Sequence, residues 1–81
     1  MAKKITVKDI LDLSDEQSEI NIIFYAYGQF YGSTANDNLD TVGDIKRNLR
    51  YDLLKAKITE MRVVKFDNIE PFLRIKAEIV N

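Results

Sequence analysis

The densest group of side chains that could do chemistry is a run of carboxylates in the first quarter of the chain. It comprises Asp9, Asp12, Asp15, Glu16 and Glu19. Asp9 and Asp12 are one helical turn apart, so on a helix they would share a face. Paired-carboxylate catalysis or metal binding would also need them to converge in a cleft. A solvated helix face followed by a polar loop explains the run more simply, and we predict no metal site.

Other catalytic and cofactor signatures are missing from the sequence. The loop Asn36-Asp37-Asn38-Leu39-Asp40 is rich in oxygen ligands, but it lacks the central glycine and the downstream glutamate of a calcium loop. There is no phosphate loop and no nucleophile elbow. The absence of His and Cys excludes Ser-His and Cys-His catalysis, histidine-ligated zinc and disulfides. We therefore predict that the protein is not an enzyme and uses no cofactor and no small-molecule substrate.

A basic cluster in the second half offers a different chemistry. Its centre is Lys46, Arg47 and Arg50. Together with tyrosines on the sheet, these cations could bind nucleic acid by phosphate contact and base stacking. Interspersed acidic residues and a net charge of −1 favour an ordinary charged helix face. Nucleic-acid binding is kept as the alternative function.

The net charge hides an asymmetry between the two halves. Residues 1–40 carry a net charge of −4 and residues 41–81 carry +3. Charges scattered over a solvated surface would explain this difference. The other interpretation is a bipolar molecule whose acidic and basic surfaces meet other molecules.

The elements that must position these groups occur twice. Residues 6–10 and 41–45 share the pattern Thr-Val-x-Asp-Ile, in which the threonine is a helix N-cap and the aspartate lies in the first turn. The spacing predicts a helix over 7–13 and another over 42–56, the second either continuous or split near Asn48. Each leads into a hairpin, which gives an internal pseudo-repeat of residues 6–34 and 41–80.

Alternating apolar residues predict four strands. They cover residues 19–26, 29–33, 58–66 and 72–80, with a turn at Gly28 and a second turn ended by Pro71. The fold predicted is α+β: a single domain over residues 1–81, a two-layer sandwich of αββαββ order with a four-stranded, mostly antiparallel sheet. The predicted core comprises Val7, Ile10, Leu11, Ile20, Ile22, Phe24, Ile45, Leu49, Leu53, Met61, Val63, Leu73, Ile75 and Ile79.

The strand face away from the helices carries more apolar surface than a wet face needs. The candidate interaction residues are Ile23, Tyr25, Tyr27, Val64 and Phe66, with one of Phe30 and Tyr31 beside them and Phe72 as a further candidate. Exposed aromatics occur singly in many proteins, and a flat ligand could also use such a face. The alternative is a protein contact, most simply a symmetric homodimer through the sheet face or an edge strand. A one-residue slip of the third strand would turn Val64 and Phe66 inward.

Several segments together resemble short proteins of prophages and mobile elements of Gram-positive bacteria. They are Thr-Val-Lys-Asp-Ile-Leu at residues 6–11, Glu-Ile-Asn-Ile at 19–22, Thr-Val-Gly-Asp-Ile at 41–45 and Tyr-Asp-Leu-Leu at 51–54. The chain departs from that pattern at Gly43 and in the extra basic residues that follow. The resemblance implies a bacterial or phage accessory protein that is cytosolic and non-catalytic, and it assigns no site residues.

The function predicted from the sequence is a small non-catalytic protein-interaction module, phage-derived by that resemblance. Its partner would be another protein or a second copy in a homodimer. The longest apolar run, residues 22–27, is far too short to span a membrane, and the composition suits the cytoplasm.

Overall fold

The structure is a computed structural model that describes residues 5–79, apart from the side chain of Ile69. It confirms the predicted α+β class and the four-stranded sheet. The predicted domain of residues 1–81 and the predicted strand end at Val80 extend beyond the described residues. The elements follow the order α1 (Val7–Leu13), β1 (Ile20–Ala26), β2 (Gln29–Ser33), the 3₁₀ turn η1 (Ala35–Asp37), α2 (Val42–Asn48), α3 (Tyr51–Leu54), β3 (Lys57–Phe66) and β4 (Ile69–Glu78).

The strands form one mixed sheet in the order β2-β1-β4-β3. Each hairpin is antiparallel, β1 with β2 and β3 with β4. The two hairpins meet at β1 and β4, which run parallel with Ile22 in register with Ile75. Two of the three strand pairs are thus antiparallel, and the central pair is not.

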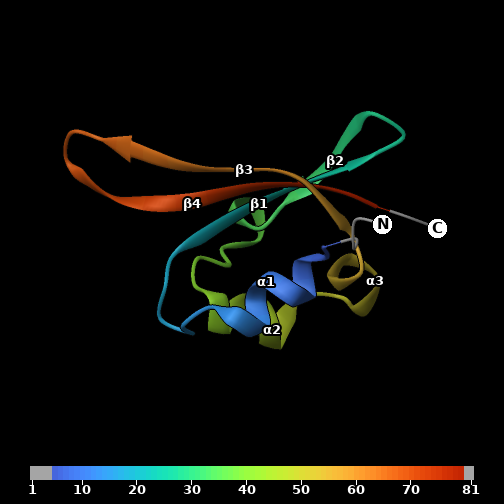
Figure 1. Cartoon of the computed structure of the whole chain (residues 1–81), viewed down its shortest axis with the longest axis horizontal. Helices are drawn as coiled ribbons and strands as arrows, with labels where there is room; N and C mark the ends of the chain where they lie inside the picture. The colour runs from blue at the N-terminus through green and yellow to red at the C-terminus, as the bar shows by residue number, and fades with distance from the viewer. Residues whose placement is uncertain (1–4, 80–81) are drawn as a thin grey trace.

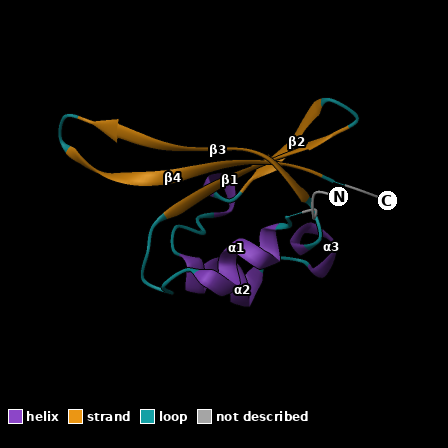
Figure 2. Ribbon diagram, viewed as in Figure 1, coloured by secondary structure: helices purple, strands orange, loops and turns teal. Residues whose placement is uncertain are grey.

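The three α-helices lie on one side of the sheet (Figures 1 and 2). Their apolar residues meet the inward-facing residues of β1 and β4, which removes both apolar surfaces from water. The fully buried apolar residues form the core: Val7, Leu11, Ile20, Ile22, Phe24, Val42, Ile45, Ala56, Ile75 and Ala77. Five other residues that were predicted to be in the core are partly buried against it: Ile10, Leu49, Leu53, Leu73 and Ile79.

Two residues predicted to be in the core are exposed instead. Met61 is 45% exposed and Val63 is 69% exposed. Met61 is in register with Ile75 and Val63 with Leu73, so both do face the side of the helices. However, β3 is an edge strand, and the tip of the β3–β4 hairpin reaches beyond the helices (Figure 1). The prediction was correct about the face and wrong about burial, because no helix within residues 5–79 covers this part of the sheet.

Both predicted helix caps are present. The Thr6 hydroxyl accepts the Asp9 N–H at 3.3 Å, and the Asp9 carboxylate accepts the Thr6 N–H at 3.0 Å, which completes a capping box. The Thr41 hydroxyl accepts the Asp44 N–H at 3.2 Å. These bonds satisfy backbone groups that the first helical turn leaves without partners.

Each of the two capped helices is anchored on the other half of the chain. The Val7 N–H donates to the Ala56 carbonyl at 3.0 Å, immediately before β3. The Val42 N–H donates to the Ser18 carbonyl at 3.0 Å, shortly before β1. The two helix–hairpin units are therefore interlocked rather than stacked side by side.

The structure settles one open point and corrects another. The second helical region is split: α2 ends at Asn48, and Leu49 is extended with φ −77° and ψ 137°. Pro71 does not end a turn but lies inside β4, where the register with β3 shifts between Val64 and Phe66. A bulge accommodates proline because the extra residue need not donate to the ladder.

The tight turn between β1 and β2 gives a stability prediction. Tyr27 and Gly28 both have positive φ, 54° and 78°, as a two-residue hairpin turn requires. We expect Gly28→Ala to lower the free energy of unfolding by about 1–2 kcal/mol, because a Cβ is strained in this conformation. Urea denaturation would measure the change. Gly32→Ala is the matched control, since Gly32 has no positive φ and open space where the Cβ would lie. Equal losses in the two variants would contradict the prediction.

Candidate functional site

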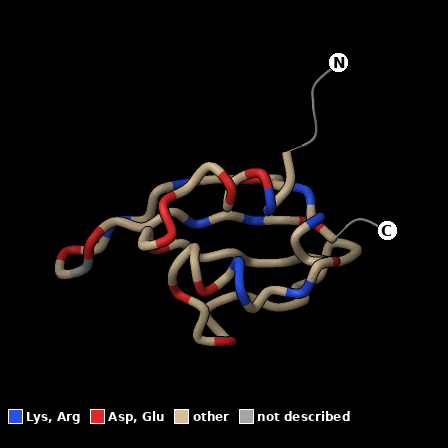
Figure 3. Tube along the Cα trace, turned by 90° about the horizontal axis from the view of Figure 1, so that it is seen from below, with Lys and Arg blue, Asp and Glu red and all other residues tan. Residues whose placement is uncertain are grey.

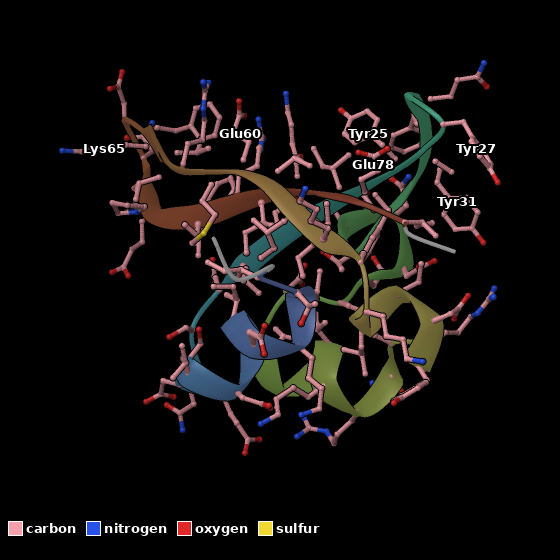
Figure 4. The ribbon with its side chains drawn as sticks, turned by 45° about the vertical axis from the view of Figure 1, so that its right-hand side comes forward. Tyr25, Tyr27, Tyr31, Glu60, Lys65 and Glu78 are labelled. Carbon is pink, nitrogen blue, oxygen red and sulfur yellow. The ribbon has the colours of Figure 1, made fainter. Side chains whose placement is uncertain are left out.

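The candidate site is the side of the sheet away from the helices, called here the outer face. Strand residues alternate between the two sides, so residues in register across the sheet share a side. Ile22, Phe24, Ile75 and Ala77 are buried on the helix side. Their neighbours along each strand therefore belong to the outer face. Figure 4 shows Tyr25 and Glu60 projecting on this side.

One aromatic cluster lies at the end of the outer face next to the β1–β2 hairpin. Tyr25 is in register with Phe30, and their rings meet edge to face with centroids 6.5 Å apart. Tyr27 extends the cluster into the turn and is 87% exposed. Ile23 lies two residues along β1 from Tyr25 and is partly buried. Phe30, rather than Tyr31, joins the outer face, because the β1–β2 register shifts at this point.

A second cluster lies at the opposite end, on the β3–β4 hairpin. Val64 is in register with Phe72. The rings of Phe66 and Phe72 have centroids 6.3 Å apart at 31°. Val64 therefore stays on the outer face, and the third strand has not slipped inward. Phe66 is 51% exposed, so this cluster also presents apolar surface to solvent.

Charged side chains separate the two clusters. One row across the sheet runs from Ile23 through Lys76 to Glu60, and the next runs from Asn21 through Arg74 to Arg62. The sequence predicted one apolar patch made of residues from β1 and β3. The structure keeps those residues on one face but divides them, because strand β4 and two charged rows lie between Tyr25 and Phe66.

The predicted basic cluster around Lys46, Arg47 and Arg50 does not form a free cationic surface in the described chain. Lys46 Nζ is 3.9 Å from the Asp12 carboxylate, and Arg47 lies between Glu16 at 3.3 Å and Asp44 at 3.1 Å. These pairs join α2 to α1 and to the loop after it, so the acidic and basic halves neutralise each other locally. Figure 3 shows positive and negative residues side by side in this region.

Arg50 behaves in the same way. Its guanidinium bonds the Asp52 carboxylate at 2.7 and 3.2 Å, and these bonds raise the pKa of Arg50 above its ordinary value. Arg50 precedes α3 on the helix side, opposite the outer-face aromatics. The predicted combination of helix cations with the tyrosines of the outer face is therefore not brought together. Tyr31 of β2 does lie beside Arg50, and both line one shallow pocket on the helix side.

The acidic residues of the opening run are held apart by structural roles. Asp9 belongs to the capping box, and Asp12 pairs with Lys8 at 2.7 Å. Asp15 accepts the Gln17 N–H at 2.8 Å, and Glu16 pairs with Arg47. Within residues 5–79, no three acidic side chains gather as a group that could hold a metal ion.

Sequence reasoning missed the pair Arg62 and Arg74 as site residues. Arg74 was visible as part of the wet face of the last strand, but nothing in the sequence placed Arg62 opposite it. That pairing depends on the β3–β4 register and on β4 lying beside β1. Long-range strand pairing carries no local sequence signal, so only the structure shows it.

Comparisons of the chain with protein-family models, with curated proteins and with solved structures gave no match. Among the described residues, no helix has the length and apolar character that crossing a membrane would require. The outer face is therefore interpreted from its own geometry and charge.

Proposed function

We propose that the protein is a small, non-catalytic protein-interaction module that works through the outer face of its sheet. One observation carries the proposal: all three helices of the described chain cover the same side of the sheet, and the other side carries two apolar clusters (Figure 2). Monomeric proteins seldom leave such clusters in water, and Tyr and Phe are enriched in the centres of protein interfaces. The proposed contact residues are Ile23, Tyr25 and Tyr27 at one end and Val64 and Phe66 at the other.

The simplest partner is a second copy of the chain in a symmetric dimer. Besides the outer face, the free edge of β3 could join two copies. Ile58 donates its N–H to the Ile5 carbonyl at 2.9 Å, so the start of that edge is covered. Beyond Ile58, no further strand of the described chain pairs with the edge. Unpaired edges are common sites of strand-to-strand association.

The remaining parts of the proposal concern origin and setting. We treat the fold as a two-layer αββαββ sandwich in which one helix–hairpin unit is used twice. The resemblance of the chain's sequence to short proteins of prophages and mobile elements supports a bacterial or phage accessory role in the cytoplasm. No step of catalysis and no bound cofactor enters the proposal.

The proposal predicts the effect of a charge placed in the first cluster. Tyr25→Glu should convert a dimer to monomers, because a carboxylate buried in an apolar contact loses its hydration without gaining a partner. Light scattering after size exclusion, at low and high salt, measures the mass. Tyr51→Glu is the matched control, since Tyr51 is equally a tyrosine, 67% exposed, but lies on α3 on the helix side.

The possible masses separate the partners. A dimer that survives Tyr25→Glu would contradict association through this end of the face and point to the β3 edge. A wild-type monomer at both salts would contradict self-association, and the partner would then be a different protein. A Tyr51→Glu variant that also dissociates would show that the effect is not specific to the outer face.

A further inference from the structure

The centre of the outer face carries two arginines directly opposite each other. Arg74 on β4 is in register with Arg62 on β3 and with Asn21 on β1. Ile75 is fully buried on the helix side, so its neighbour Arg74 must belong to the outer face. The three side chains form one row across three strands, called here the arginine row. Opposed like charges on neighbouring strands are unfavourable, so this arrangement needs an explanation.

The cations at and beside the arginine row have too few acceptors. Glu60 is the only carboxylate among residues 5–79 that is paired with any of them: its Oε2 is 3.8 Å from Arg62 Nε and 3.6 Å from Lys76 Nζ. Arg74 takes part in no ion pair within the described chain. Glu60 thus pairs with two of the three cations, and within the described chain the third cation, Arg74, has no carboxylate partner.

Arg74 is held in place without having its hydrogen bonds satisfied. Its Nε is buried and has no hydrogen-bond partner within the described chain. Its guanidinium carbon lies 5.9 Å from the centroid of the Phe72 ring, which fixes the planar group over the second apolar cluster. A buried donor without an acceptor is costly, and a charged donor more so. The guanidinium is a planar fork of N–H donors, and this shape matches the two oxygens of a carboxylate.

We propose that the arginine row binds a carboxylate side chain from an acidic segment of a partner protein. This inference rests on the proposed function and names the chemistry that the interface reads. A carboxylate bound to Arg74 and Arg62 would accept hydrogen bonds from their guanidinium groups and neutralise the opposed charges. The amide of Asn21, at the end of the row, offers a further donor.

The surroundings of the arginine row define the rest of the segment. On β4 the distance from the level of Tyr25 to Phe72 is about 20 Å, the length of roughly six extended residues. A segment with acidic residues in the middle and apolar residues at both ends would match the two clusters and the row between them. Polyphosphate is a poorer match, because Glu60 lies among the cations and the chain is net negative.

A second copy of the same face is also a poor match for the arginine row itself. In a symmetric face-to-face dimer centred on the arginine row, Arg62 and Arg74 would meet the same arginines of the other copy. Like charges brought together in an interface oppose association. The acidic segment is therefore assigned to a different protein, and self-association through the Tyr25 cluster or the free edge of β3 is a separate contact.

The test follows the arginine side chains by NMR in the ¹⁵N-labelled protein. The probe is the peptide acetyl-Leu-Ser-Glu-Glu-Ser-Leu-amide, compared with its counterpart in which both Glu are Gln, and with a thymidine hexanucleotide. The acidic peptide should shift the Arg74 and Arg62 Nε–H signals saturably, and the Gln peptide should not. Arg62→Gln and Arg74→Gln should each weaken peptide binding about tenfold or more, as loss of a charge-assisted hydrogen bond predicts.

Lys65→Gln is the matched control, because it removes one positive charge from the same strand. Lys65 is one residue from Val64 and two from Val63, which places it on the side of β3 that faces the helices. It should leave peptide binding within about twofold. An unshifted Arg74 signal, equal shifts with the Gln peptide, or stronger shifts with the oligonucleotide would overturn the proposal.

These outcomes are distinguishable from failure of the proposed function. If Tyr25→Glu disrupts association while the acidic peptide leaves Arg74 unchanged, the outer face is an interface and the arginine row is not its carboxylate site. If the peptide binds and both arginine variants weaken it, the carboxylate site stands even for a protein whose mass shows a monomer.

Discussion

Replacing Phe24 with alanine is expected to remove roughly 3–5 kcal/mol from the free energy of unfolding. Phe24 is only 2% exposed and is the largest side chain in the centre of the core. It lies on β1 with its side chain in the core, in register with Ala77 of the parallel strand β4. The substitution loses the transfer free energy of the ring and leaves a cavity that a small domain can only partly close. Because such domains have roughly 5–15 kcal/mol in total, a measurable fraction should unfold without denaturant.

Urea denaturation followed by circular dichroism measures this loss. Tyr25→Ala is the control, since Tyr25 is the next residue on the same strand but points to the outer face and is only partly buried. Tyr25→Ala should lower the free energy of unfolding clearly less than Phe24→Ala does. Equal losses of unfolding free energy in the two variants would show that the sheet is covered on both sides in solution.

Replacing Thr34 with valine is expected to lower the free energy of unfolding by about 1–3 kcal/mol, although the two side chains are similar in shape. Thr34 is 1% exposed, and its hydroxyl accepts the Ile22 N–H at 3.0 Å. Its own N–H donates to the Ile22 carbonyl at 3.0 Å, and its carbonyl accepts the Leu39 N–H at 2.9 Å. Thr34 thus joins β1 to the loop that leads to α2. Valine would leave the Ile22 N–H buried without an acceptor.

Thr34→Ser separates this hydrogen bond from packing. Serine keeps the hydroxyl and loses only a methyl group, so it should restore most of the stability lost in Thr34→Val. Hydrogen exchange at the Ile22 amide gives a local readout, which should accelerate in the valine variant and remain slow in the serine variant. A serine variant as unstable as the valine variant would assign the effect to the methyl group instead.

Local sequence signals predicted the elements well and their assembly poorly. The capped helix over residues 7–13 and the strand over 29–33 occur at the predicted residues, because caps and turns act through neighbours in the chain. Thr34, in contrast, follows the predicted second strand in a stretch of small polar residues that suggests an exposed loop, yet it is buried. In the buried position it is hydrogen-bonded to Ile22, twelve residues away in the sequence. The residues next to Thr34 in the sequence give no sign of this contact.

The candidate site shows the same limit. Alternation along the strands placed Tyr25 and Val64 on the outer face, where the structure has them. It could not show that β4 lies between their strands, so the charged rows that divide the apolar clusters were not foreseen. Met61 and Val63 were assigned to the core for a related reason, because a strand pattern shows which side a residue faces but not whether a helix reaches it.

The parallel pairing of β1 with β4 has a consequence for synthesis on the ribosome. The central strands of the sheet come from distant parts of the chain, with Ile20 beside Leu73. Until residues up to Glu78 have emerged, β1 has only β2 as a neighbouring strand, and Ile22 and Phe24 lack their β4 neighbours Ile75 and Ala77. Contacts this distant in sequence also slow the folding of small domains. A nascent chain should therefore stay open until β4 has been made and then close in a single step, as β4 inserts between β1 and β3.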